Sequence, residues 1–253
     1  MKRFLPLYAV AVYTFLYLPL LVLSMFSFNS SRFSVWEGFT FKWYGEVFGN
    51  ENLLEATVNS LTVGLVCTVL ATTVGTLAGY AIWKHRSNFV TNSLYLSLLT
   101  PEIVTGVSLL AFFQFVFRFL RVPLGMHTVI LAHVSFCLAY VVIVILARLR
   151  TFDKTLEEAS MDLGANEWQT FLYVTAPALL PGIAAAALLC FTVSFDDYVI
   201  TSLVAGVDSE TLPMVIYSMA RKGVSPTVNA LSAIITVGLG FFILLAGRVE
   251  RKL

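Results

Sequence analysis

Charged residues are scarce in this chain. Asp, Glu, Lys and Arg together make up 12% of its 253 residues, whereas apolar residues make up 58%. Soluble globular domains carry about 25% charged residues. The composition therefore excludes an ordinary soluble globule and indicates a protein that lies in a lipid bilayer.

The chain has few cysteines and lacks the phosphate-binding motif of P-loop ATPases. The three cysteines, Cys67, Cys137 and Cys190, lie in three different apolar stretches without zinc-ligand spacing, so we expect small buried hydrophobes and no metal site. The phosphate-binding motif G-x-x-x-x-G-K-[ST] does not occur. We therefore predict that this chain binds no ATP in the P-loop manner and holds no cofactor of its own.

Long apolar stretches are what the sequence has in quantity. A helix needs about 20 residues to cross the hydrocarbon core of a bilayer. Six stretches are long enough, and we place them near residues 5–28, 58–83, 94–117, 128–147, 177–204 and 228–247. The sequence thus predicts an all-α, polytopic membrane protein with six transmembrane helices, forming a single transmembrane domain over residues 1–253.

The basic residues suggest an orientation for these helices. If the N-terminus lies inside, the inner segments hold 10 Lys and Arg residues and the outer segments hold 6. Inner loops of membrane proteins carry the excess of such residues. We therefore expect both termini to be cytoplasmic and the protein to reside in the cytoplasmic (inner) membrane.

Three features inside the stretches predict local structure. Gly75 and Gly79 have the small-xxx-small spacing that lets two helices approach closely. Pro101 predicts a kink, because it has no amide hydrogen for the helix. His133 has no second ligand at helical spacing, so a buried imidazole that is hydrogen-bonded to a neighbouring helix is favoured over a metal ligand.

The longest polar interruption between stretches, residues 155–177, has a helix–turn–helix pattern. Leu156, Ala159 and Leu163 give a short helix one apolar face. Gly164 suits the left-handed residue that ends such a helix. Asn166, with Gln169 three residues later, predicts the N-cap of a second short helix. An interfacial helical hairpin without a partner is the alternative interpretation.

The same segment resembles the cytoplasmic EAA loop of ABC importer permeases. The matching residues are Glu158-Ala159-Ser160, Gly164-Ala165, Phe171, Val174 and Pro177. Ser160 and Ala176 depart from that pattern, which has Ala and Leu there. The resemblance implies a type I importer permease fold with a coupling loop over residues 151–174 that contacts a separate ATPase. The coupling residues that it implies are Glu157, Glu158, Ala159, Asp162, Gly164, Ala165 and Phe171.

Three of the fifteen acidic residues, Glu102, Asp196 and Asp197, lie within the predicted spans, and no Lys or Arg lies there to pair with them. A carboxylate at the centre of a membrane helix costs about 2.5–3.5 kcal/mol on insertion scales. These side chains should therefore face a polar pathway or a cationic substrate. Alternatively, Asp196 and Asp197 only mark a wet outer mouth.

A second resemblance covers nearly the whole chain and points to spermidine/putrescine importer permeases. Its motifs are Tyr17-Leu-Pro19, Phe28-Asn29-Ser30-Ser31, Trp43-Tyr44, Pro101-Glu102-Ile103-Val104, Ser194–Tyr198, Leu212-Pro213, Gly223–Pro226 and Asn229–Leu231. Those relatives more often have Asp where this chain has Glu102. Polyamines are flexible polycations, which suits the three carboxylates together with Phe195 and Tyr198 through charge pairing and cation–π contact.

The resemblance implies several partners and no nucleic acid. They are two ATPase subunits that bind ATP and Mg²⁺, a second permease subunit, an extracytoplasmic polyamine-binding protein, the polyamine and the bilayer. The chain itself is expected to be a transport subunit and not an enzyme.

Two alternative functions stay open, and a third is disfavoured by the positions of its residues. An ion-coupled secondary carrier for cationic solutes also uses intramembrane carboxylates, but it has no need of an EAA-like loop. An ABC permease for another class of substrate is a further alternative. An intramembrane aspartyl protease is disfavoured, because Asp196 and Asp197 are neighbours on one helix and catalytic carboxylates must converge.

Overall fold

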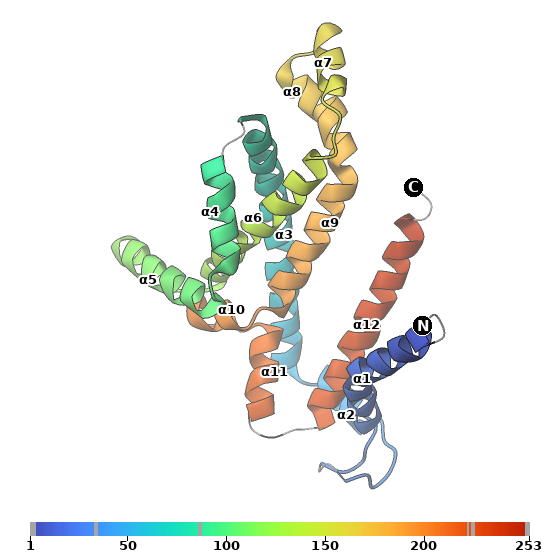
Figure 1. The fold of residues 1–253 in the computed structure, drawn as a ribbon. Helices are drawn as coiled ribbons and strands as arrows, with labels where there is room; N and C mark the ends of the chain where they lie inside the picture. Colours follow the sequence, from blue (N-terminus) through green and yellow to red (C-terminus); the bar gives the residue numbers. More distant parts are fainter. Residues whose placement is uncertain (1–3, 33–34, 86–87, 222, 224–225, 251–253) are drawn as a thin grey trace. The chain divides into compact units, whose positions relative to one another are not determined.

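The protein is built from helices in the computed structural model, which describes residues 4–32, 35–85, 88–221, 223 and 226–250 (Figure 1). Within these ranges no β-strand occurs, and one isolated antiparallel bridge joins Asn29 and Phe39. The all-α prediction is confirmed. The chain forms two compact units, residues 1–55 with 215–253 and residues 56–214, which are described separately below.

Five helical segments in the described ranges are long and apolar enough to cross a membrane: Pro6–Phe26, Glu51–His85, Glu102–Phe119, Met126–Leu149 and Glu167–Asp196. The sixth predicted span falls on α12 (Pro226–Glu250), whose described apolar part, Pro226–Gly238, is shorter. A sixth crossing therefore stays a prediction. Residues 1–3 and 251–253, which carry part of the orientation argument, lie outside the described residues.

The first unit contains α1 (Phe4–Phe26), α2 (Lys42–Phe48) and α12. Buried Asn29 organises the segment between α1 and α2. Its carbonyl accepts a hydrogen bond of 2.6 Å from the Trp43 indole, and its side-chain amide donates one of 2.7 Å to the Val35 carbonyl. These bonds satisfy the backbone of an irregular segment, as buried polar groups require.

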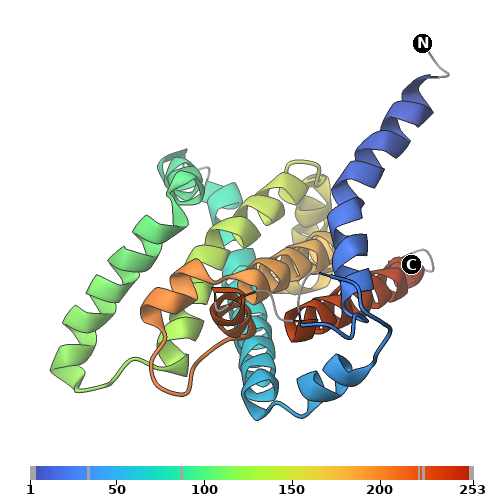
Figure 2. The same cartoon turned by 90° about the horizontal axis from the view of Figure 1, so that it is seen from below.

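The second unit contains most of α3 (Glu51–His85) and all of the next helices. These are α4 (Asn88–Leu99), α5 (Glu102–Leu120), α6 (Met126–Leu149), α7 (Thr155–Asp162), α8 (Glu167–Thr170), the π-helical turn η1 (Phe171–Thr175), α9 (Ala176–Asp196) and α10 (Val199–Val204). Helix α11 (Leu212–Arg221) crosses the boundary of the two units. Helices α6 and α9 run side by side in both views (Figure 1 and Figure 2).

Helices α3, α6 and α9 share one buried apolar cluster, which includes Ala71, Val141, Ile145, Leu179 and Ala186 together with Cys67, Cys137 and Cys190. The predicted close approach of helices at Gly75 and Gly79 is confirmed. A Cβ atom on Gly75 would lie 2.6 Å from Cγ1 of Val141, and one on Gly79 would lie 2.9 Å from Cγ2 of Ile145. Only glycine lets α3 pack at this distance from α6.

Replacing Gly75 with leucine is expected to destabilise the protein by about 1–3 kcal/mol, because the added atoms overpack the α3–α6 contact. The midpoint of thermal unfolding of the purified protein measures the effect. The matched control is Gly238→Leu in α12, where no described atom lies within 4 Å of the new Cβ. Equal midpoints for the two variants would contradict the packing argument.

Two predicted spans are interrupted in the structure. The stretch 94–117 was expected to kink at Pro101, but the helix ends at Leu99 and α5 begins at Glu102. Proline disfavours helical backbone in the residue before it, so Thr100 leaves the helix and the chain restarts. The stretch 177–204 is also divided, since α9 ends at Asp196 and α10 begins at Val199. Both breaks lie at the same cavity.

Candidate functional site

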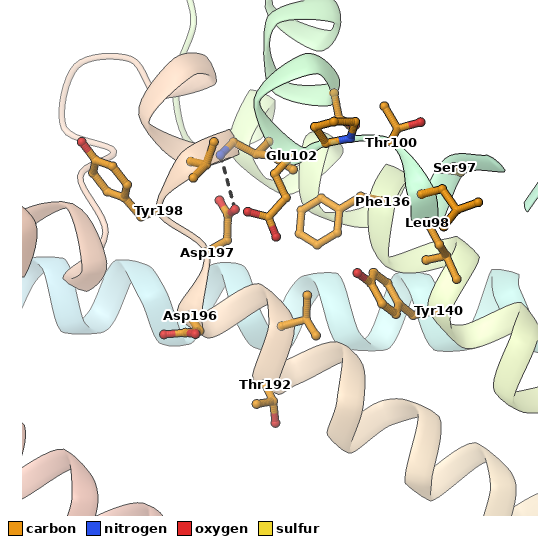
Figure 3. A pocket seen from close by; sticks show the side chains of 16 residues that line it. Ser97, Leu98, Thr100, Glu102, Phe136, Tyr140, Thr192, Asp196, Asp197 and Tyr198 are labelled. Carbon is orange, nitrogen blue, oxygen red and sulfur yellow. Dashed lines mark hydrogen bonds between the residues drawn. The ribbon is translucent and has the colours of Figure 1, made fainter. Parts of the chain in front are cut away.

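A cavity of about 640 Å³ lies in the second unit, between the end of α4, the start of α5, α6, and the junction of α9 with α10 (Figure 3). Ligand pockets in proteins commonly have volumes of about 300–1,000 Å³. Four of the five predicted pathway residues line it: Glu102, Asp196, Asp197 and Tyr198. Phe195 does not line this cavity and instead stacks on Phe191, with 5.7 Å between the ring centroids.

Glu102 owes its position to the proline before it. Pro101 is the N-cap residue of α5, so Glu102 lies in the first turn of that helix. The N-terminal end of a helix carries partial positive charge and favours an anionic side chain. In Figure 3 the side chains of Glu102 and Asp197 point toward the same space. Among the described residues, neither Glu102 nor Asp196 has an ion-pair partner.

Asp197 connects the two halves of the broken span. Its carboxylate accepts hydrogen bonds from the backbone N–H of Ile200 at 3.3 Å, from that of Thr201 at 2.8 Å and from the Thr201 hydroxyl at 2.7 Å. These bonds satisfy the first amides of α10, as an N-cap side chain does. Asp197 thus both lines the cavity and fixes the α9–α10 junction.

His133 of α6 is a partner of Asp197 that the sequence alone does not reveal. Its Nε2 atom lies 3.5 Å from Oδ2 of Asp197 and 2.9 Å from the Thr201 hydroxyl, and its Nδ1 atom lies 2.7 Å from the Ser194 hydroxyl. No Lys or Arg pairs with the three carboxylates within the described spans, as expected, but His133 lies within ion-pair distance of Asp197. The expectation of a buried imidazole bonded to neighbouring helices is confirmed, since His133 is 1% exposed.

The direction of these hydrogen bonds follows from the chemistry of the groups. An ionised carboxylate only accepts, so the single Thr201 proton points to Asp197, and the Thr201 oxygen accepts from His133 Nε2–H. The His133 Nδ1 atom shares the second hydrogen bond with the Ser194 hydroxyl. A chain of hydrogen bonds thus connects Ser194, His133, Thr201 and Asp197 at the cavity wall.

Two aromatic residues of the cavity wall were missed. Phe136 and Tyr140 of α6 line the cavity beside the carboxylates. They lie three and seven residues after His133, so all three share one face of the helix. That spacing was present in the sequence, but nothing local distinguished this face from the faces that contact lipid or core. Aromatic rings there can contact a cation through their faces.

The segment that is predicted to be the coupling loop has the expected helix–turn–helix form. Helix α7 covers Thr155–Asp162, and Gly164 follows with a left-handed φ of 91°. Asn166 and Gln169 exchange hydrogen bonds of 2.8 and 2.9 Å between side chain and backbone, which makes the capping box of α8. Before α7, the N–H and hydroxyl of Thr155 donate to Asp153 and hold the pKa of that carboxyl below its usual value.

The predicted coupling residues divide into exposed and buried ones. Glu158, Ala159, Asp162 and Gly164 are exposed, Ala165 is half-buried, and Glu157 and Phe171 are buried. Leu163 is 90% exposed, so the predicted apolar face of α7 is left uncovered in this chain.

Buried Glu157 ties the coupling loop to the helix bundle. Its Oε1 atom accepts hydrogen bonds from the Tyr80 hydroxyl of α3 at 3.0 Å and from the Thr175 hydroxyl of η1 at 2.5 Å. Around this contact the Tyr80 and Phe171 rings lie 4.8 Å apart, and Lys84 forms an ion pair of 3.0 Å with Glu167. The loop is thus joined directly to the ends of α3 and α9.

Comparison with known proteins gives consistent matches over most of the chain. PotC, the spermidine/putrescine transport system permease protein of Escherichia coli K12, is 40% identical over 234 residues, which are 91% of this chain and 87% of PotC. PotI, the putrescine transport system permease protein of the same strain, is 40% identical over 251 residues, which are 95% of this chain and 89% of PotI.

Solved structures match the fold. A chain of the bacterial alginate ABC transporter, crystallised in complex with an alginate pentasaccharide-bound periplasmic protein, superposes with a TM-score of 0.75. The match covers 99% of this chain and 96% of that chain at 20% sequence identity. The MetNI methionine ABC transporter matches with a TM-score of 0.64 and 19% identity over 79% of this chain and 95% of that chain. These matches confirm the ABC importer permease fold.

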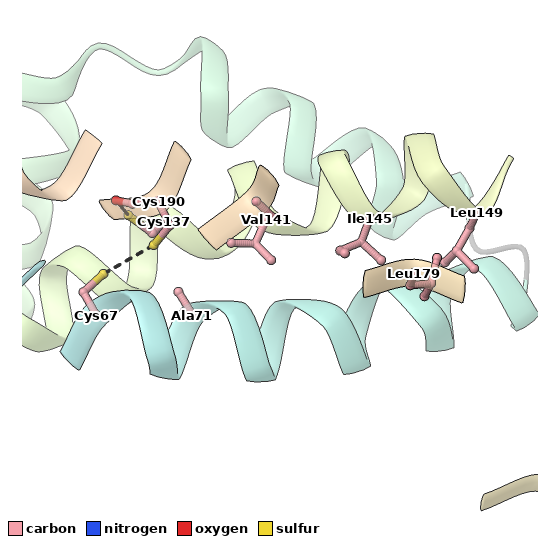
Figure 4. Packing of buried hydrophobic residues seen from close by; sticks show 9 residues of the cluster. Cys67, Ala71, Cys137, Val141, Ile145, Leu149, Leu179 and Cys190 are labelled. Atoms are coloured by element: carbon pink, nitrogen blue, oxygen red, sulfur yellow. Dashed lines mark hydrogen bonds between the residues drawn. The ribbon is translucent and has the colours of Figure 1, made fainter. Parts of the chain in front are cut away.

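A family model described as binding-protein-dependent transport system inner membrane component matches residues 71–253. This range includes the residues that line the cavity, the predicted coupling loop and the part of the α3–α6–α9 core that follows residue 70 (Figure 4). The resemblance to importer permeases is therefore confirmed over most of the chain, and the protein is a multi-pass component of an inner membrane. The chain belongs to the family of inner membrane components of binding-protein-dependent transport systems.

Proposed function

We propose that this chain is a permease subunit of an ATP-driven importer of polyamines such as spermidine and putrescine. The observation that carries the proposal is the cavity, where carboxylates of Glu102, Asp196 and Asp197 meet the rings of Phe136 and Tyr140. The 40% identity to PotC and PotI supports the same class of substrate. A flexible polyamine offers ammonium groups for the carboxylates and methylene groups for the rings.

The remaining subunits of such an importer lie outside this chain. We expect an ATPase pair that binds ATP and Mg²⁺, a second permease subunit and an extracytoplasmic polyamine-binding protein. The exposed residues Glu158, Leu163 and Gly164 of the coupling loop are the contact that we propose for the ATPase. Closure of the ATPase pair would then move α3 and α9 through the loop and alternate the access of the cavity as a rigid-body change.

Neutralising the free carboxylates tests the substrate site. Glu102→Gln and Asp196→Asn are each expected to raise the KM for polyamine uptake about tenfold or more, because a hydrogen bond between charged groups contributes about 1.5–3 kcal/mol. Uptake by the reconstituted complex is the measurement, with Glu55→Gln, an exposed carboxylate outside the cavity, as the control. Unchanged KM values in both cavity variants would show that these carboxylates only mark a wet mouth.

The energy source and substrate class need a separate experiment. ATP hydrolysis by the complex in proteoliposomes should rise with diamines and triamines and should not rise with neutral amino acids. Uptake that continues without the ATPase subunits and follows an ion gradient would favour the secondary carrier. Stimulation by another class of solute would instead favour an ABC permease with a different substrate.

A further inference from the structure

The segment between α1 and α2 is folded with polar side chains inside and aromatic rings outside. Three of its polar residues are buried: Ser27 (0% exposed), Asn29 (1%) and Ser31 (4%). Three of its rings are exposed: Trp36 (49%), Phe39 (64%) and Phe41 (64%). A loop that faces water has the opposite arrangement, because the transfer of apolar rings out of water is favourable. The pattern therefore indicates that apolar material covers this segment.

Hydrogen bonds inside the segment let its polar groups do without water. The side-chain oxygen of Asn29 accepts a hydrogen bond of 3.0 Å from the backbone N–H of Glu37. The backbone N–H of Ser30 donates one of 2.8 Å to the carbonyl of Gly38. Within a membrane, backbone polar groups must be satisfied internally in this way.

Four rings of the segment form one connected cluster, which we call the aromatic shelf: Phe28, Phe39, Phe41 and Tyr44. Phe28 stacks on Phe39 with 5.1 Å between the ring centroids, and Phe41 lies edge-on to both. Beside the shelf, Trp36 contacts Phe26, the last residue of α1, with 6.3 Å between the centroids. The shelf thus continues the apolar surface of α1, a helix long and apolar enough to cross a membrane.

We propose that the aromatic shelf is a phospholipid-binding surface that lies at the headgroup level of the bilayer. Amphipathic rings such as those of Trp and Tyr favour that level. A helix that crosses the hydrocarbon core places the residues after its last turn there. Ser27, the residue between α1 and the shelf, is buried, so no exposed polar residue separates the two apolar surfaces. This continuity favours the bilayer over a separate protein as the cover of the shelf.

Two cations next to the shelf offer a contact for the lipid phosphate. The guanidinium of Arg32 and the ammonium of Lys42 lie 5.9 and 5.4 Å from the centre of the Trp43 ring. Lys42 pairs with Glu46 at 3.7 Å, whereas Arg32 has no ion-pair partner within the described ranges. Since arginine binds phosphate through two parallel hydrogen bonds, Arg32 is the residue that we assign to this contact.

The fluorescence of Trp36 tests the proposal. The transporter complex is reconstituted with phospholipids that carry bromine near the top or near the end of their acyl chains. The contribution of Trp36 is the difference from the Trp36→Phe complex. We expect quenching by the shallow bromine, weaker quenching by the deep bromine and little quenching by iodide in the water.

Two results would overturn the proposal. Quenching of Trp36 by iodide alone would show that water covers the surface, and protection from both quenchers would show that a protein does. Trp168 of α8 is the matched control, because it is 60% exposed and lies in the predicted coupling loop. Its contribution, measured with Trp168→Phe, should not respond to brominated lipid.

Variants of the shelf locate the contact within the segment. Replacing Phe39 and Phe41 together with serine should remove most of the quenching of Trp36 by lipid and expose Trp36 to iodide. Phe48→Ser, at a position that is also 64% exposed but outside the shelf, should keep the quenching by lipid. Unchanged quenching in the double variant, or an equal loss in the control, would contradict the role of the shelf. If the double variant does not assemble, the quenching of the unmodified complex decides.

Arg32→Gln tests the phosphate contact separately. The variant complex should retain less phospholipid than the unmodified complex after extensive delipidation, measured as phosphate per complex. Equal phosphate would overturn the assignment of Arg32. None of these measurements depends on polyamine transport, so their failure leaves the proposed function untouched.

Discussion

A leucine in place of His133 is expected to lower the thermal unfolding midpoint of the complex by roughly 5–10 °C. Leucine has a similar volume and cannot replace either hydrogen bond of the imidazole. The hydroxyls of Ser194 and Thr201, residues that are 4% and 0% exposed, both lose their hydrogen-bond partner on the imidazole. Each buried polar group without a partner costs about 1–3 kcal/mol.

The same substitution should also reduce polyamine uptake, because His133 and Thr201 hold Asp197, which lines the cavity. His133→Gln is the control, since its amide keeps a donor for the Thr201 hydroxyl, and it should recover part of the midpoint and of the uptake. A midpoint of the leucine variant equal to that of the unmodified protein would show that the imidazole contributes little to the junction of α6, α9 and α10.

Replacing Glu157 with alanine is expected to uncouple transport from ATP hydrolysis. The change leaves the Tyr80 and Thr175 hydroxyls without their shared acceptor and removes the contact between α7 and the ends of α3 and α9. Hydrogen bonds to a charged acceptor contribute about 1.5–3 kcal/mol each, so the loss of both weakens the attachment of the coupling loop. Uptake should fall at least about tenfold while ATP hydrolysis continues.

The control variant Glu157→Gln removes the negative charge but keeps an acceptor for the two hydrogen bonds. Its amide oxygen still accepts from both hydroxyls, so this variant should retain most of the uptake. Both rates are measured on the same reconstituted complex. Uptake by the alanine variant at the unmodified rate would mean that the loop transmits force by another contact, such as the Lys84–Glu167 ion pair.

The coupling loop is the part of the site that the sequence predicts best. Gly164 and the Asn166–Gln169 capping box act within a few residues, so their geometry is determined locally and can be read without knowledge of the fold. The structure confirms both. The buried position of Glu157 was not predictable in this way, because its two partners come from α3 and η1, and only packing brings them together.

The same limit explains the errors at the cavity. The apolar stretches indicate where helices lie but not which faces meet, so His133 was not connected with Asp197, and the three cysteines were not connected with one another. Phe195 was grouped with the pathway because it adjoins Asp196 in the sequence. On a helix adjacent residues point about 100° apart, and Phe195 turns to Phe191 instead.

The π-helical turn η1 between α8 and α9 determines the directions in which the side chains of α9 point. Residues 171–175 insert one residue beyond the regular α-helical count into a continuous helical segment, and each residue of an α-helix advances the chain by about 100°. Shortening this turn by one residue would therefore rotate Asp196 away from the cavity and Cys190 away from the core, although neither residue itself would change. The length of the turn is thus a structural constraint of its own, separate from the contacts that Phe171 and Thr175 make.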